Sequence, residues 1–174
     1  MNRSLATFSL LAFVLGAASA IAAKKAFDPK AYYEGMGAPA AVEALLARAE
    51  VLAEGGSWER IAIARVRYLS GDKPKGQAMI DGVLKGKVAT SDLYRIATIY
   101  ALAEEWDKAK PLFEKAIAAD PADDRSVMEA ACWFNLNGDR ARAEQLLRTA
   151  FEESPDEVWH YIAAAGSFAG LKPF

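Results

Sequence analysis

The sequence predicts an all-α protein, an α-solenoid of stacked antiparallel helical hairpins. Three observations predict it. Apolar residues with helical spacing recur at an interval of 34 residues, and proline-containing turns recur at the same interval. Ala is abundant whereas Val, Ile and Thr are sparse, which favours helix over strand. Apolar residues make up 53% of the chain and charged residues 25%, which is ordinary globular usage and argues against a disordered or polytopic membrane protein.

Residues 1–22 have the order of features of a secretory signal peptide. A short start containing Arg3 and no acid precedes an apolar run over residues 5–15. Small residues follow, and two A-x-A patterns end at Ala20 and Ala22. We therefore expect cleavage directly after one of these two alanines, export, and no membrane insertion of the mature chain. The brevity of the signal indicates a bacterial periplasm, with secretion beyond it as a further destination.

An uncleaved membrane anchor is the alternative. Residues 4–23 are 20 residues without a charge, which is long enough to cross a bilayer, and Lys24 and Lys25 would mark the far end. The small residues at the end of the run favour cleavage instead.

Residues 23–39 are expected to run extended, because two Pro and two Gly fall between Ala26 and Pro39. A helical repeat domain is expected over residues 40–170. It opens with a lone helix whose apolar face consists of Val42, Leu45, Leu46 and Ala49.

The first hairpin is expected at about residues 57–89. Its first helix, residues 58–69, contains an alternation of apolar and other residues that by itself would also suit a strand, and the flanking repeats decide for helix. Gly76 is expected as the small residue where the second helix touches the first. The apolar face of that second helix consists of Met79, Ile80, Val83 and Leu84.

The repeat is clearest from residue 90 onwards. First helices of successive units carry a large, a medium or small, a small and an aromatic residue in fixed order: Leu93, Ile96, Ala97 and Tyr100, then Val127, Ala130, Ala131 and Phe134, then Tyr161, Ala164, Ala165 and Phe168. Second helices repeat Ala109, Leu112, Phe113, Ala116 and Ile117 as Ala143, Leu146, Leu147, Ala150 and Phe151. Pro121 and Pro155 follow these second helices. Each is expected to end its helix, because proline lacks an amide donor and disfavours a helical conformation in the residue before it. We therefore expect hairpins at 90–123 and 124–157 and a closing helix at 158–169, eight helices in all.

This pattern resembles the tetratricopeptide repeat (TPR) family. The resemblance covers residues 90–157 as two full repeats and residues 158–169 as the first helix of a third. It implies a right-handed superhelix whose concave face is lined by the first helix of each repeat. It also implies that this face binds a segment of another protein.

The resemblance places the candidate partner-binding residues on the first helices. They are Ser91, Tyr94, Thr98, Arg125, Met128, Cys132, Asn135, Trp159 and Ile162. Tyr94 and Met128 are the expected anchors, whereas Glu114 is expected on the outer face without a part in binding or stability. The Lys and Asn with which some family members grip a C-terminal carboxylate are absent. The groove therefore suits an extended segment or a helix held mainly by apolar contacts.

Side chains for catalysis are scarce. His160 and Cys132 are the only histidine and the only cysteine, and they are 28 residues apart, so a Cys–His pair and a multi-histidine metal site are not expected. We expect His160 on a helix surface and Cys132 as a small apolar residue facing the inner face, with an intermolecular disulfide as the alternative. Gly82 to Lys87 lacks the spacing and the Ser or Thr of a phosphate loop. No catalytic residue, metal or cofactor is expected.

Charge is distributed unevenly along the chain. Residues 59–87 hold seven basic and three acidic side chains, and residues 88–174 hold nine basic and fifteen acidic ones. The net charge of −2 argues against nucleic acid as a partner. The expected function is a non-catalytic adaptor or scaffold of the bacterial envelope. A self-associating structural component of an envelope assembly and a membrane-anchored repeat protein are the alternatives.

Overall fold

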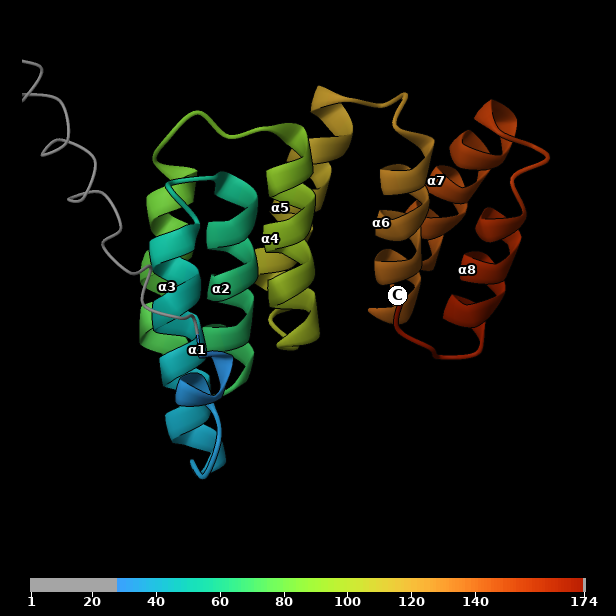
Figure 1. The fold of residues 1–174 in the computed structure, drawn as a ribbon. Helices are drawn as coiled ribbons and strands as arrows, with labels where there is room; N and C mark the ends of the chain where they lie inside the picture. The colour runs from blue at the N-terminus through green and yellow to red at the C-terminus, as the bar shows by residue number, and fades with distance from the viewer. Residues whose placement is uncertain (1–27, 174) are drawn as a thin grey trace, which may run out of the picture. The chain divides into compact units, whose positions relative to one another are not determined.

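The computed structural model describes residues 28–173, and Figure 1 shows their fold. These residues contain eight α-helices and one short 3-10 helix, and no strand occurs among them. They belong to two units, one ending at Leu45 and one beginning at Leu46. The expected signal peptide, or anchor, at residues 1–22 lies outside the described residues. Within residues 28–173, no helix is long and apolar enough to cross a membrane.

The first unit contains a short helix where extended chain was expected. The 3-10 helix η1 (Pro29–Tyr32) begins after Asp28, whose carboxylate accepts a hydrogen bond from the Lys30 amide at 3.0 Å. Proline at the start of a helix loses no hydrogen bond and already has a helical φ, so a prolyl residue here favours a turn of helix rather than extended chain. The expectation for residues 23–39 is therefore wrong at residues 29–32, and also at Ala38 and Pro39, which belong to the helix Ala38–Leu52.

The second unit consists of the end of α1 (Ala38–Leu52), three helical hairpins and a closing helix. The hairpins are α2 (Ser57–Leu69) with α3 (Lys73–Leu84), α4 (Thr90–Leu102) with α5 (Trp106–Ala119), and α6 (Asp124–Leu136) with α7 (Arg140–Glu153), and the closing helix is α8 (Val158–Phe168). The first helices pack on one another in the order α2, α4, α6, α8. The predicted fold class, an all-α solenoid of eight helices, is confirmed.

The turn inside each hairpin contains one residue with a left-handed backbone. Gly71 has φ +110°, Glu104 has φ +62° and Gly138 has φ +82°. The next helix follows within a few residues, and at α7 the Asp139 carboxylate caps the start by accepting from the Arg142 amide at 3.4 Å. Glycine suits this conformation because it has no Cβ, whereas Glu104 adopts it at a cost.

The two apolar series read from the sequence form the core. In α4 and α6 all eight first-helix positions of the series are buried, and Ala109, Phe113, Ala116, Ala143 and Ala150 of the second helices are fully enclosed. In α8 only Ala164 of the corresponding four is buried, while Tyr161 and Phe168 are about half exposed. Both rings contact α7, since Tyr161 packs on Phe151 at 4.7 Å between ring centroids and the Arg140 guanidinium lies 4.3 Å from the Phe168 ring centroid. They stay half exposed because no further helix follows α8 among the described residues.

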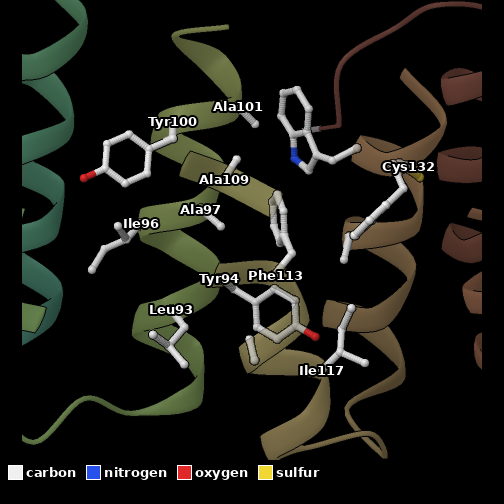
Figure 2. Close-up of a cluster of buried hydrophobic side chains, with 14 of the residues drawn as sticks. Leu93, Tyr94, Ile96, Ala97, Tyr100, Ala101, Ala109, Phe113, Ile117 and Cys132 are labelled. Atoms are coloured by element: carbon white, nitrogen blue, oxygen red, sulfur yellow. The ribbon is translucent and has the colours of Figure 1, made fainter. Parts of the chain in front are cut away.

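Aromatic side chains join the second hairpin to the third. The Phe113 ring lies 6.1 Å from Tyr94 and 6.5 Å from Phe134, centroid to centroid, and Trp106 meets Phe134 edge-on at 5.1 Å. Figure 2 shows the Tyr94 ring beside Phe113, between α4, α5 and α6. Such pairs contribute about 0.5–1.5 kcal/mol each beyond the burial of their surface.

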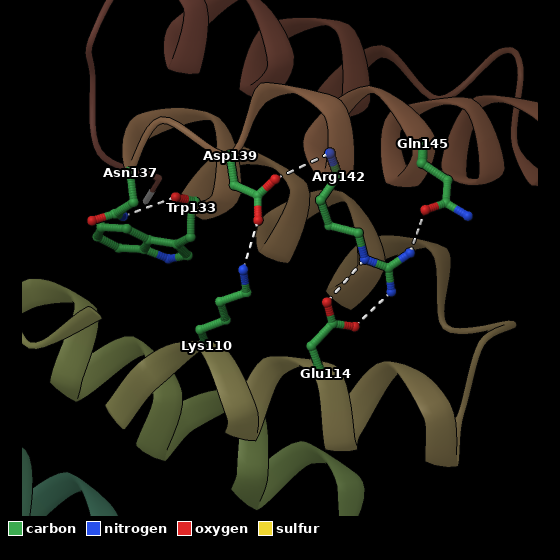
Figure 3. Close-up of polar contacts among 7 residues, drawn as sticks. All are labelled: Lys110, Glu114, Trp133, Asn137, Asp139, Arg142 and Gln145. Atoms are coloured by element: carbon green, nitrogen blue, oxygen red, sulfur yellow. Dashed lines mark hydrogen bonds and ion pairs between the residues drawn. The ribbon is translucent and has the colours of Figure 1, made fainter. Parts of the chain in front are cut away.

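Ion pairs join the second helices of neighbouring hairpins. The Arg142 guanidinium on α7 donates to both carboxylate oxygens of Glu114 on α5, at 3.0 and 2.6 Å (Figure 3). Lys110 on α5 pairs with Asp139 at 2.8 Å. The sequence analysis expected Glu114 to have no part in stability. The structure corrects this, because the bidentate pair with Arg142 fixes the orientation of both side chains.

A second polar cluster holds the first hairpin against the second. The Tyr68 hydroxyl on α2 donates to Glu105 at 2.7 Å, and Glu105 also pairs with Lys108 at 2.7 Å and with Lys73 at the start of α3. Burial acts to raise the pKa of Glu105, but the hydrogen bonds from Lys108, Lys73 and Tyr68 outweigh it and lower that pKa to about 2. The carboxylate is thus held ionised by three partners from three helices.

Candidate partner-binding groove

The first helices of the second unit present two hollows. The arginine hollow has a volume of about 680 Å³ and is formed by residues of α2, α4 and α6. The terminal hollow has a volume of about 820 Å³ and is formed by residues of α6 and α8. Arg125, Glu129 and Pro173 line both, so the two hollows adjoin. Together the two hollows form one groove.

The groove contains most of the residues that the sequence assigned to partner binding. Ser91, Tyr94, Thr98 and Arg125 line the arginine hollow, and Arg125, Met128, Trp159 and Ile162 line the terminal hollow. The structure thus brings seven of the nine candidates together, since Arg125 belongs to both sets.

The remaining two candidates form contacts between α6 and α8 instead. Asn135 donates to the Ser167 hydroxyl at 3.2 Å, and Ser167 in turn donates to the Ala164 carbonyl at 2.8 Å. Cys132 is 1% exposed, and burial raises the pKa of its thiol to about 11 although Ser167 acts to lower it. A thiol in that position is inaccessible, so the structure argues against the intermolecular disulfide.

Tyr94 and Met128 are buried rather than exposed, which corrects their expected part as anchors. Their side chains are 5% and 2% exposed, and the Tyr94 ring packs on Phe113. They lie in the floor of the groove. The residues that project from its wall are Trp58, Trp159 and Ile162, with 56%, 65% and 44% of their surface exposed. Exposed aromatic and aliphatic residues of this size are typical of protein contact sites.

Trp58 is a residue that the sequence reasoning missed. The register of residues 58–69 was ambiguous, so no concave-face position was transferred to that helix.

Three arginines, one from each of three successive first helices, line the arginine hollow. They are Arg65 on α2, Arg95 on α4 and Arg125 on α6. Among the described residues none of the three has a carboxylate within 4.0 Å of its guanidinium. Arg67, Arg140 and Arg142 form such pairs, whereas Arg48, Arg60 and Arg148 do not, so the shared location of the three distinguishes them and the lack of an ion pair does not. These arginines too were absent from the sequence-based set, apart from Arg125.

Arg95 is held in place by an aromatic ring. The centre of its guanidinium lies 3.2 Å from the centroid of the Trp58 ring, and its Nη1 atom is buried without a hydrogen-bond partner among the described residues. Stacking on the ring face orients the guanidinium.

Glu129 is the single acid of the arginine hollow. Burial raises the pKa of its carboxyl, and Arg125 and Arg95 act in the opposite direction without reversing the shift. With three arginines and one carboxyl, the arginine hollow is basic. The terminal hollow is acidic, because Asp124, Glu129 and Glu157 face only Arg125 and His160 there.

His160 is buried, not on the helix surface as expected. It is 4% exposed, its Nε2 atom lies 3.7 Å from the Asp124 carboxylate, and its ring meets Phe151 edge-on at 6.4 Å. Over the described residues no group of three or more His, Cys, Asp and Glu side chains is arranged to hold a metal ion.

The paired, stacked helices define a class of protein, an α-solenoid built from helical hairpins. The chain is 29% identical over 115 residues to human protein O-mannosyl-transferase TMTC1. The similarity covers 62% of this chain and 13% of that protein, so the chain spans a small part of its relative's length. With the paired helices it supports TPR-like helical repeats. No protein-family model and no solved structure matches the chain.

Proposed function

We propose that this protein is a non-catalytic adaptor that holds a peptide segment or a helix of a partner protein in its groove. One observation carries the proposal. The groove joins exposed apolar residues, Trp58, Trp159 and Ile162, to three arginines, Arg65, Arg95 and Arg125, that form no ion pair with another described residue. Apolar and polar residues are combined in this way in the centre and rim of protein interfaces. The similarity to part of TMTC1 supports a protein-interaction repeat fold in a general way.

A non-catalytic role is proposed because the nucleophile and base candidates are enclosed. Cys132 and His160 are 1% and 4% exposed. A nucleophile must reach a substrate, and a general base must reach the proton that it removes.

An envelope location is proposed on the N-terminal sequence alone. Arg3, the apolar run and the small residues ending at Ala20 and Ala22 support export to a bacterial periplasm. Intact-mass measurement of the protein from an envelope fraction tests this. A mass corresponding to a chain that begins at Ile21 or Ala23 supports it, and a full-length chain in the inner membrane favours the anchor.

Site-specific photo-crosslinking tests the adaptor function. A photoreactive residue in place of Ile162, inside the groove, is expected to give discrete adducts with a partner in extracts of the producing cells. The same residue in place of Arg148, exposed on α7 outside the groove, serves as control. Adducts from the Arg148 position alone would move the partner to the second-helix face, against the proposal.

Self-association is a second candidate function, favoured by the outer face of α8. Tyr161 and Phe168 occupy the positions at which the preceding repeat buries Val127 and Phe134, but Phe151 and Arg140 of α7 cover them only in part. A second copy of the chain could cover these rings. Light scattering measures this: a dimer that Phe168→Ser converts to a monomer supports the idea, and a monomer at high concentration excludes it.

A further inference from the structure

We propose that the arginine hollow recognises an internal acidic segment of the partner, in which Asp or Glu side chains alternate with apolar residues. This inference rests on the proposed adaptor function and names the chemistry of its ligand. Carboxylate side chains of the segment pair with Arg65, Arg95 and Arg125, and its apolar side chains contact the floor and Trp58.

The first argument is the state of the three arginines. An exposed arginine on a solvated helix surface needs no partner, but these three converge on one hollow from three different helices. Arg95 is half-buried, stacked on Trp58, and has a buried Nη1 without a partner in the described part of the chain. A guanidinium that is oriented before binding loses little side-chain entropy when it pairs with a carboxylate.

The second argument is the apolar surface between the charges. Ile61 and Ile99 lie in the floor of the same hollow, and Leu102 and Thr98 are half-buried in its wall. An extended segment presents successive side chains to opposite sides, so alternate residues can meet the floor while their neighbours meet the arginines. A helix would present one broad face and would leave part of this mixed surface unmatched.

The third argument concerns which anions fit. The whole chain carries a net charge of −2, and residues 88–174 hold an excess of six acids, so a long polyanion such as nucleic acid is repelled outside the hollow. A short acidic segment meets only the local field of the three arginines. Its neighbouring residues then reach the terminal hollow, where Asp124 and Glu157 favour a neutral or basic continuation.

The fourth argument is the position of Glu129. It is the hollow's only acid and feels both Arg125 and Arg95, yet forms no ion pair within 4.0 Å with either in the described structure. The arginines are therefore only partly compensated by their own protein. Charge complementarity of this kind steers association and selects partners more than it sets total affinity.

The test uses the full chain and two synthetic peptides of about twelve residues, a length that spans the hollow when extended. One alternates Glu with Leu and Phe, and the other replaces every Glu by Gln. Both are fluorescein-labelled, with an amidated C-terminus so that a terminal carboxylate does not contribute. Fluorescence anisotropy at low salt is expected to show about tenfold tighter binding of the Glu peptide, a difference of about 1.4 kcal/mol. Because the arginines are partly exposed, this ratio should shrink as salt is added.

Two double variants with equal charge change locate the effect. Arg65→Gln with Arg125→Gln should remove most of the preference for the Glu peptide, about a tenfold loss. Lys115→Gln with Arg148→Gln, on exposed positions of α5 and α7, should leave it unchanged. Circular dichroism confirms that each variant is folded. Arg65→Glu with Arg125→Glu should reverse the preference toward a third peptide with Lys in place of Glu.

Each outcome decides the proposal. Equal binding of the Glu and Gln peptides, or a Glu preference equally reduced by both double variants, overturns the acidic-segment inference. If the Gln peptide still binds and Trp58→Ala weakens it, the groove remains a peptide site and only its charge selectivity is wrong. If neither peptide binds and the Ile162 position gives no adducts, the adaptor function fails as well.

Discussion

Gly76 lies against the backbone of Tyr68, and the two helices of the first hairpin touch at this point. A Cβ atom added at Gly76 would lie 2.7 Å from the Tyr68 amide nitrogen and 2.9 Å from its Cα atom. The later hairpins place Ala109 and Ala143 at the corresponding point, both completely buried. The first hairpin is thus packed more closely at this contact than the other two.

The contact predicts the effect of Gly76→Ala. The methyl group meets backbone atoms that move only with α2, so the change should destabilise the protein by about 1–3 kcal/mol despite the better helix propensity of Ala. Urea unfolding measures this. Gly82→Ala in the same helix is the control, because its Cβ would meet only the flexible Arg60 side chain at 3.3 Å, and it should be neutral or stabilising. Equal effects of the two changes would contradict the close packing.

Tyr94→Ala should lower stability rather than only weaken partner binding. The ring is 5% exposed and packs on Phe113, so its removal leaves a cavity that costs about 3–5 kcal/mol. Thermal unfolding followed by circular dichroism gives the answer. Trp159→Ala, which removes a side chain 65% exposed, should change the melting temperature little. A Tyr94→Ala protein as stable as the wild type would restore Tyr94 as a free binding residue.

The left-handed turn residues predict opposite effects of two substitutions. Glu104→Gly should stabilise the protein by up to about 1 kcal/mol, because glycine adopts φ +62° without the cost paid by a residue with a Cβ atom. Gly138→Ala, at φ +82° in the next hairpin, should destabilise it by a similar amount. Chemical denaturation of both variants gives the two differences in unfolding free energy. The same sign for both would show that the turns are not equivalent.

The lowered pKa of Glu105 predicts that the free energy of unfolding decreases in acid. Its pKa is about 2 in the folded protein and lies below its ordinary value of 4.5, so the unfolded chain takes up the proton first. The stabilisation is complete above about pH 4.5 and is lost as the pH falls toward 2. Glu105→Gln should therefore cost about 1–3 kcal/mol near neutral pH and flatten this part of the pH–stability curve.

The control for Glu105 is Glu144, whose carboxylate pairs with Arg140 on the surface of α7 with both side chains more than half exposed. Glu144→Gln should change stability by less than about 0.5 kcal/mol at any pH. An unchanged acid slope in Glu105→Gln would show that another carboxylate carries the effect.

Cys132 should be unreactive in the folded protein. Its thiol is 1% exposed and its pKa is raised to about 11, so little thiolate forms at pH 8 and reagents do not reach it. A chromogenic disulfide reagent should therefore label it only after denaturant is added. Arg148→Cys in a Cys132→Ser background provides an exposed thiol that should react at once. Rapid labelling of the native wild type would show that α6 and α8 separate readily.

The repeat in the sequence was sufficient for the fold, because the physical cause of that pattern is local. A helix that buries one stripe needs apolar residues every three or four positions, and stacking identical units repeats the stripe at the length of the unit. The eight residues of the first-helix series in α4 and α6 illustrate this, since all are buried as predicted. The short helix at residues 29–32 was missed because Pro and Gly mark irregular chain without saying which kind.

The binding face depended on tertiary structure. The sequence placed Tyr94 and Met128 on the first helices, but only the packing of neighbouring helices, such as α5 with Phe113 against Tyr94, decided that they are buried. Two further contacts could not be predicted from the sequence. They are the ion pair of Glu114 with Arg142, 28 residues apart, and the stacking of Arg95 on Trp58, 37 residues apart. Helical periodicity determines which way a residue faces on its own helix, and burial and charge pairing depend on what the neighbouring helix brings to that face.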